Sequence, residues 1–149
     1  MTFTPWAKWQ DRNGMQNLKM PGVYALSITQ KDIVQKPYST VREIAYYGMT
    51  NSKGGLKSRL NQFDNTIKGK HVAHGGAQRF LFKYPDYDEL CKKLYVAVRA
   101  FDCDVKSNSP KDLRVMGEIA KYEYDCFAEY LEKHGSLPEF NDKKRSPKK

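Results

Sequence analysis

Hydrophobic residues along the chain follow two periodicities, and each predicts a different kind of element. Three stretches rich in β-branched and aromatic residues, 23–28, 43–49 and 94–101, are typical of strands. The third stretch is almost wholly apolar, which predicts a central, buried strand. The polar segment 29–42 is expected to form a long hairpin connection, so the first two strands should pair antiparallel.

Helical periodicity appears in three other segments. Apolar residues recur every three or four positions over 56–67, and more briefly over 77–84. The longest helix should occupy 110–134, because Ser109 is a good N-cap and Gly135 suits a left-handed C-cap. The order of elements predicts an α/β domain of the α+β kind, with a three-stranded, largely antiparallel sheet flanked by helices.

The length and the termini bound the organisation of the protein. The chain has 149 residues, enough for one core, and we expect a single domain over 1–141. Residues 142–149 are charged and nearly apolar-free, and this basic tail is expected to be disordered. The sequence contains no signal-peptide pattern and no apolar run of the roughly 20 residues needed to cross a membrane. A cytoplasmic protein with three reduced cysteines is expected.

The charge balance changes this picture. Lysine and arginine number 26 against 17 acidic residues, giving a formal net charge of +9. The tail contributes five of the basic residues, so an excess remains in the domain itself. A field of this size on a small domain attracts polyanions, and the chain is expected to bind nucleic acid rather than membranes.

Short motifs in the predicted elements narrow the expectation. They are Gly22-Val23-Tyr24 on the first strand, Tyr46-Tyr47-Gly48 on the second, Leu56-Lys57-Ser58-Arg59-Leu60 on the helix, a glutamate on the last helix, and Pro138-Glu139-Phe140-Asn141 after it. In this order the chain, from about Pro21 to Asn141, resembles the GIY-YIG nuclease superfamily. The resemblance implies a GIY-YIG-like fold and a metal-dependent DNA endonuclease, with a restriction-like or stand-alone enzyme the favoured type.

The resemblance also implies roles for three residues. Tyr24 would act as general base on the attacking water, and Tyr46 would orient water or phosphate. Because an unperturbed tyrosine has a pKa of about 10, a neighbouring cation must lower it, and Arg59 and Lys53 are the candidates. Arg59 would also stabilise the charge on the phosphorus centre, since its planar fork matches phosphate oxygens.

Two glutamates of the last helix compete for the metal. With an apolar face of Met116, Ala120, Phe127 and Leu131, Glu123 falls beside the packed face and Glu118 points nearly opposite. We therefore expect Glu123 to bind the metal. A single carboxylate with several waters is typical of Mg²⁺, and Mn²⁺ is the other candidate.

Further polar residues are candidates for the same site. Asn141 could hold a water or a phosphate through its side-chain amide, or serve the turn it lies in. His71 and His74 follow the arginine helix, where family members place a histidine that assists proton transfer. The chain departs from the family at Phe63, which cannot exchange a proton, so one of these histidines is expected to take that role.

The remaining expectations concern binding. Basic residues flanking the site should track DNA phosphates: Lys53, Lys57, Lys68, Lys70, Arg79 and Lys83. Cutting both strands with one site per chain favours a homodimer or sequential nicking. The alternative is a catalytically weak nucleic-acid-binding module with the same fold, motivated by Phe63 and by the two competing glutamates. A basic adaptor that uses exposed tyrosines for protein contacts is a third hypothesis.

Overall fold

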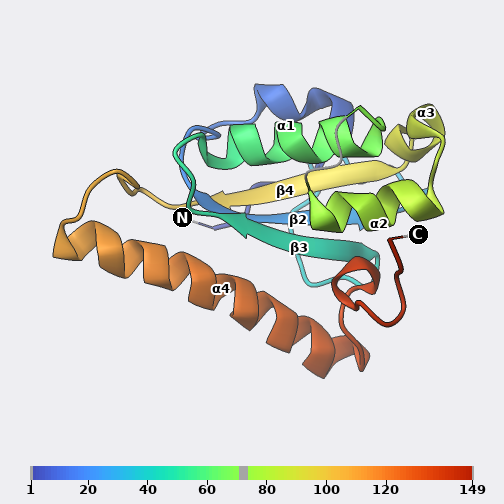
Figure 1. The fold of residues 1–149 in the computed structure, drawn as a ribbon. Coiled ribbons are helices and arrows are strands. Elements are labelled where there is room, and N and C mark those ends of the chain that lie inside the picture. Colours follow the sequence, from blue (N-terminus) through green and yellow to red (C-terminus); the bar gives the residue numbers. More distant parts are fainter. Residues whose placement is uncertain (1, 71–73, 149) are drawn as a thin grey trace.

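The computed structural model describes residues 2–70 and 74–148, and its centre is a four-stranded antiparallel sheet (Figure 1). The strands, in the spatial order β1-β4-β2-β3, are β1 (Ala7–Lys8), β4 (Leu94–Ala100), β2 (Gly22–Ile28) and β3 (Ile44–Thr50). The antiparallel pairing of β2 with β3 and the interior position of β4 confirm the sequence-based prediction. The predicted number of three strands is wrong. β1 has only two residues and no alternation of its own, and it exists because Ala7 and Lys8 pair with β4.

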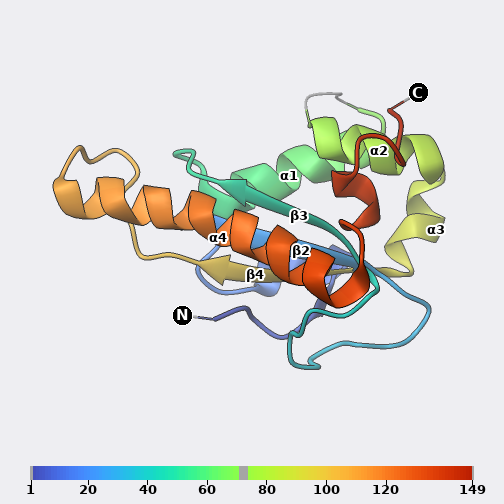
Figure 2. The same cartoon turned by 90° about the horizontal axis from the view of Figure 1, so that it is seen from below.

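Helices cover both faces of the sheet (Figures 1 and 2). On one face lie the 3₁₀ helix η1 (Trp9–Gly14) and the helices α1 (Gly55–Ile67), α2 (Gly75–Lys83) and α3 (Tyr87–Cys91). The long helix α4 (Pro110–His134) crosses the other face, and η2 (Glu139–Asn141) follows it beside β3. The domain therefore has three layers, with the sheet in the middle.

The pleat of β2 divides its side chains between the two layers. Tyr24 and Leu26 pack among the residues of α1 and α2, whereas Val23 and Ala25 pack against α4. β2 and β4 are buried almost throughout, but β3 lies at the open edge of the sheet. That edge runs between the α1–α2 layer above and α4 below (Figure 1).

The bounds of α4 agree with the sequence, but its buried face differs from the predicted one. Ser109 accepts the cap hydrogen bond from the Asp112 amide, and Gly135 takes the left-handed conformation. The buried residues are Ile119, Cys126 and Tyr130, while Leu131 is 46% exposed. Tyr130 is the reason: its hydroxyl donates to the Arg42 carbonyl at 2.7 Å, which rotates the helix so that the residue after it faces solvent.

The C-terminal segment, expected to be disordered, forms a turn that is described through Lys148. Arg145 donates from Nη2 to the Leu137 carbonyl at 2.6 Å, and Ser146 is buried and donates to the Asp142 carbonyl at 2.8 Å. The segment returns from η2 to the side of α2 (Figures 1 and 2). None of the helices described is long and apolar enough to span a membrane.

Candidate functional site

Two tyrosines converge on the α1 face of the sheet, beside its open edge. Tyr24 on β2 stands opposite Gly48 on β3, and Tyr46 stands opposite Leu26 two residues along. The ring centroids of Tyr24 and Tyr46 are 6.1 Å apart. The Tyr24 ring lies across Gly48, where any Cβ would overlap its Cζ and Oη atoms. Gly48 thus lets the Tyr24 hydroxyl reach toward the edge strand.

His74 fixes the hydroxyl of Tyr24. The residue is the N-cap of α2, where its Nδ1 accepts a hydrogen bond from the Ala77 amide at 3.3 Å. Burial, followed by the Arg59 charge, lowers the pKa of His74 to about 3, so the ring is neutral at physiological pH. A neutral ring that accepts at Nδ1 carries its proton on Nε2. Nε2 therefore donates to the Tyr24 oxygen, 2.8 Å away.

Phe63 and Gly76 hold this arrangement in place. Phe63 is fully buried, and its ring meets that of His74 edge-on with centroids 5.0 Å apart. The apolar ring of Phe63 on α1 thus supports a histidine that comes from another element. Gly76, in the first turn of α2, lies so close to Tyr46 that a Cβ would overlap the Tyr46 hydroxyl. The sequence analysis did not find this contact, because it joins residues 30 positions apart on different elements.

Arg59 supplies the positive charge of the site. It is half-buried on α1, and its guanidinium donates to the Gln62 side chain at 3.1 Å. Burial raises the pKa of Tyr24 well above its usual value, and Arg59 opposes this through its charge and a hydrogen bond. Burial also raises the pKa of Tyr46, again opposed by Arg59. Of the two expected cations, Arg59 is the one that acts on the tyrosines, and Lys53 is an exposed residue of the turn before α1.

The two candidate glutamates have different environments. Glu118 is exposed, whereas Glu123 lies one turn from both Ile119 and Cys126 on the buried face of α4 and is itself half-buried. Burial raises the pKa of Glu123 to about 7, although Arg59 acts to lower it. Glu123 has no hydrogen bond or ion pair within the described part of the chain. The Glu123 charge also acts to raise the pKa of Tyr24 and of Tyr46, so these three groups interact electrostatically.

The donor set limits how a metal could bind here. Among the described residues, no three histidine, cysteine, aspartate or glutamate side chains come together as a ligand group. The donor that remains is one carboxylate, that of Glu123. Mg²⁺ keeps several waters and often binds through one or two carboxylates, so this donor set suits that ion and not a dehydrated zinc site.

Asn141 is engaged with the backbone. Its Oδ1 accepts from the Tyr47 amide and its Nδ2 donates to the Tyr47 carbonyl, both at 2.9 Å. These two bonds satisfy the outward-facing groups of edge strand β3 and attach η2 beside the site. Asn141 therefore joins η2 to β3, a long-range role that differs from both the ligand-binding and the turn role expected from the sequence. His71 lies outside the described residues.

The basic residues expected to follow DNA divide into two groups. Lys68 pairs with Asp64 at 2.8 Å and Lys83 pairs with Glu139 at 2.5 Å, so both charges are neutralised within the fold. Lys53, Lys57 and Lys70 are exposed, and Arg79 is half-buried on α2. These four face solvent or the site without an acidic partner among the described residues.

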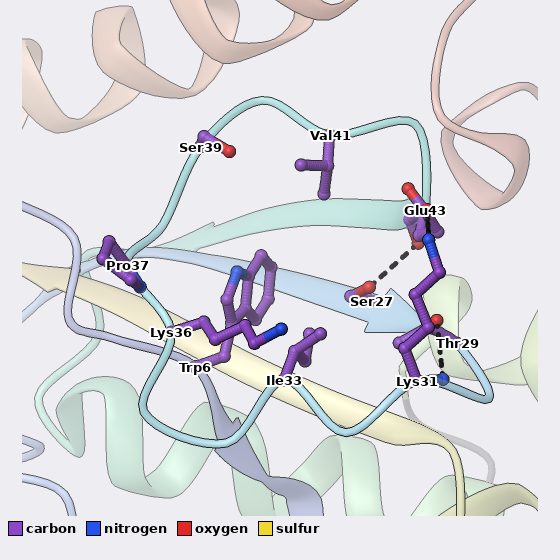
Figure 3. Close-up of a pocket in the computed structure, with 10 residues that line it drawn as sticks. All are labelled: Trp6, Ser27, Thr29, Lys31, Ile33, Lys36, Pro37, Ser39, Val41 and Glu43. Carbon is purple, nitrogen blue, oxygen red and sulfur yellow. Dashed lines mark hydrogen bonds and ion pairs between the residues drawn. The ribbon is translucent and has the colours of Figure 1, made fainter.

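A separate hollow of about 320 Å³ lies beneath the connection between β2 and β3 (Figure 3). Trp6, Ile33 and Val41 form its apolar part, and Lys31 and Glu43 form an ion pair of 3.9 Å at its rim. Its neighbours Trp6 and Val41 belong to the core on the α4 face. The hollow is therefore separated by the sheet from Tyr24 and Tyr46.

The residues brought together at the edge of β3 are Tyr24, Tyr46, Arg59, His74 and Glu123, from five different elements or caps. Comparison of the chain with protein-family models, with curated proteins and with solved structures finds no match. The interpretation of the site therefore rests on its own geometry and chemistry.

Proposed function

We propose that this protein is a metal-dependent DNA endonuclease of the GIY-YIG kind, which hydrolyses phosphodiester bonds by water attack at the edge of β3. The observation that carries the proposal is the tyrosine hydroxyl of β2 held by a neutral histidine, with an arginine and an unpaired glutamate acting on the same atoms. A buried group of this composition, with several displaced pKa values, is typical of a catalytic site.

The direction of the His74 hydrogen bond supports a particular role for Tyr24. Because Nε2 donates, the phenol oxygen is the acceptor, and the same bond would stabilise a phenolate at Tyr24. A Tyr24 phenolate could take one proton from the attacking water. The water oxygen then bonds to phosphorus, and the bond from phosphorus to the leaving oxygen breaks.

Arg59 and Glu123 would supply the electrostatic part of the reaction. Arg59 offers a planar pair of donors to the phosphate oxygens, on which negative charge accumulates in the transition state. Glu123 would hold a divalent cation, whose positive charge would favour both the phenolate and the leaving oxygen. Tyr46, between Tyr24 and Phe80, would orient the phosphate by its hydroxyl.

A second candidate function is a binding module that retains the fold but cuts weakly. The specific observation in its favour is the closure of the site. Tyr24 is fully buried and its pKa is raised, so in this state it is a neutral phenol. Such a module would show salt-sensitive DNA binding without metal-dependent cleavage.

Plasmid nicking distinguishes these functions. Wild-type protein is assayed with Mg²⁺, with Mn²⁺ and with EDTA, beside the variants Tyr24→Phe, Glu123→Gln and Glu118→Gln, and DNA binding is measured for each. Removing a general base typically lowers the rate by about 100- to 10,000-fold. We expect a loss of this order for Tyr24→Phe and Glu123→Gln, while the matched helix variant Glu118→Gln stays active.

Two results would contradict the proposal. Cleavage that persists in EDTA would remove the metal from the mechanism. Salt-sensitive DNA binding without nicking of any of several plasmids of different sequence would favour the binding module.

A further inference from the structure

A second hollow, of about 270 Å³, opens beside Tyr46 at the edge of β3. Three parts of the chain that lie far apart in sequence form its walls. The lining residues are Tyr46, Gly75, Gly76, Arg79, Phe140, Asn141, Lys143 and Lys148. We call this hollow the tail pocket, because the C-terminal segment returns to α2 to close it (Figure 2).

The charges of the tail pocket are all positive. Arg79, Lys143 and Lys148 line it, and no aspartate or glutamate does. None of these three cations has an ion pair or hydrogen bond from its side chain within the described residues. Arg79 is half-buried, so its guanidinium is partly fixed beside the hollow and can meet an anion that enters it.

The uncharged walls also present donors. The Tyr46 hydroxyl lies against Gly76, and the Arg79 charge acts on that hydroxyl. Gly75 and Gly76 carry amides of the first turn of α2, which have no partners inside the helix. The Cβ position of Gly76 is filled by the Tyr46 side chain, and the Cβ position of Gly75 lies 3.4 Å from Lys148 Nζ, so a hydroxyl and an ammonium group lie beside these amides. The apolar wall is a single ring, that of Phe140.

We propose that the tail pocket binds a backbone phosphate of the nucleic acid, next to the phosphate that is cut. Three cations, a hydroxyl and two backbone amides around a small hollow suit a tetrahedral dianion or a phosphodiester, which offers several acceptors and no donor. Tyr46 forms a wall of the tail pocket and also contacts Tyr24, so a strand lying along the edge of β3 would meet both places. This inference rests on the proposed nuclease function for its ligand.

The consequence for the tail is specific. Lys143 and Lys148 belong to a segment whose charge alone would suggest only a solvated end. Here the turn of residues 142–148 directs both lysines to the hollow, with Ser146 buried between them along the chain. The tail is thus part of the binding surface.

The first experiment detects the phosphate in the tail pocket without any nuclease reaction. Inorganic phosphate is titrated into the full-length protein at constant ionic strength, and the amide resonances of Gly75 and Gly76 are followed by NMR. We expect saturable shifts of both resonances in wild type. The shifts should be lost in the double variant Lys143→Gln/Lys148→Gln and kept in Lys106→Gln/Lys111→Gln, which removes two exposed lysines before and at the start of α4.

The second experiment uses a duplex oligonucleotide in EDTA, with affinity measured at several salt concentrations. Loss of one phosphate contact should reduce the slope of log affinity against log salt by about 1 and weaken binding about tenfold at low salt. We expect this for Lys143→Gln/Lys148→Gln and a smaller change for the control pair. Arg79→Gln tests the half-buried cation in the same way.

The outcomes separate this inference from the nuclease proposal. Equal phosphate shifts and equal salt slopes in the tail and control variants would overturn the tail pocket, even if the wild type cuts DNA. Phosphate shifts that depend on Lys143 and Lys148 would support the tail pocket, even if the wild type fails to nick plasmid and the nuclease proposal is wrong.

Discussion

Two carboxylates in this domain, Asp64 on α1 and Glu123 on α4, are both withdrawn from water but end in opposite states. Asp64 accepts hydrogen bonds from Trp9 Nε1 at 2.8 Å and from the Tyr87 hydroxyl at 2.7 Å. It also pairs with Lys68 at 2.8 Å and Arg12 at 3.3 Å. Burial acts to raise the pKa of Asp64, but these donors outweigh it and the pKa is lowered.

Glu123 has no such donors, and burial raises its pKa to about 7. The difference shows what each region does for the protein. The Asp64 cluster joins η1, α1 and α3 into a closed unit in which the carboxylate of Asp64 is satisfied by partners within the fold. In the Glu123 region, a carboxylate that interacts with an arginine and two tyrosines has no hydrogen-bond or ion-pair partner among the described residues. The missing partner costs stability and favours the binding of a cation or a substrate there.

The largest loss of stability should come from replacing Asp64, the carboxylate that has its partners within the fold. Asp64→Asn keeps the shape but removes the charge that Lys68 and Arg12 face, and losing one partner of a buried pair typically costs about 3 kcal/mol. The free energy of unfolding, measured by urea titration at pH 7, should fall by that amount. Because the folded pKa of Asp64 is lowered, its contribution is present above the unfolded value and is lost as the pH falls through the folded pKa. The difference between the two proteins should therefore narrow in acid, and an undiminished difference would contradict this account.

A smaller loss is expected where the tyrosine site depends on a glycine. Gly48→Ala would drive a methyl group into the Tyr24 ring, and such overpacking costs about 1–3 kcal/mol. Gly117→Ala on α4 is the matched control, since nothing lies within 4 Å of its Cβ position and alanine favours the helix by up to about 1 kcal/mol. A lower melting temperature for Gly48→Ala and a higher one for Gly117→Ala, each relative to wild type, would support the geometry. Equal, small effects would show that Tyr24 does not lie across Gly48.

Replacing the unsatisfied carboxylate, that of Glu123, should raise the free energy of unfolding instead of lowering it. Its folded pKa of about 7 exceeds that of an unfolded glutamate, so ionisation disfavours the folded state as the pH rises through this interval. Glu123→Gln removes that penalty and should raise the free energy of unfolding at pH 8 by about 1–2 kcal/mol, after allowance for solvent screening. At pH 4 the two proteins should be nearly equal. Lower stability of Glu123→Gln at pH 8 would show that the carboxylate has a stabilising partner in solution.

The smallest expected effect concerns His74, whose imidazole should not change its protonation state between pH 8 and pH 5. With its pKa held near 3, His74 should keep the same ring-nitrogen chemical shifts from pH 8 to pH 5, with the proton on Nε2. ¹⁵N NMR of the imidazole measures both the charge and the tautomer. A transition near pH 6, or a proton on Nδ1, would show that His74 is not the donor to Tyr24.

Much of the scaffold could be predicted because it depends on local patterns. The strands at 23–28, 43–49 and 94–101 and the helix at 110–134 follow from alternation, helical spacing and caps that act over a few residues. The short strand β1 and the helix α3 could not be found in this way. β1 exists through its pairing with β4, and α3 spans only five residues, too few to show helical periodicity.

The candidate site was predictable only in part, since its members are placed by different kinds of interaction. Tyr46 pairs with Leu26, which lies two residues after Tyr24 on β2. Strand residues two apart point to the same face, so Tyr24 and Tyr46 share a face, and the sequence reveals this once the pairing is known. The expected packing face of α4 was right at Phe127, which packs against the core, and wrong at Leu131, which is 46% exposed. The buried positions are Ile119, Cys126 and Tyr130, and the Tyr130 hydroxyl bonds to the Arg42 carbonyl. The preference for Glu123 over Glu118 at the packed side agrees with the burial of the two residues nonetheless.

The sequence by itself determined the α+β class, the strand and helix periods, the positive charge and the set of candidate site residues. Only the tertiary structure decided how those residues act. It directs His74 Nε2 to Tyr24, joins Asn141 to the backbone of Tyr47, bonds Trp9 to Asp64, and brings the tail lysines to Tyr46. The physical reason is that hydrogen bonds, ion pairs and desolvation depend on contacts between residues 50 or more positions apart, and no local pattern encodes those distances.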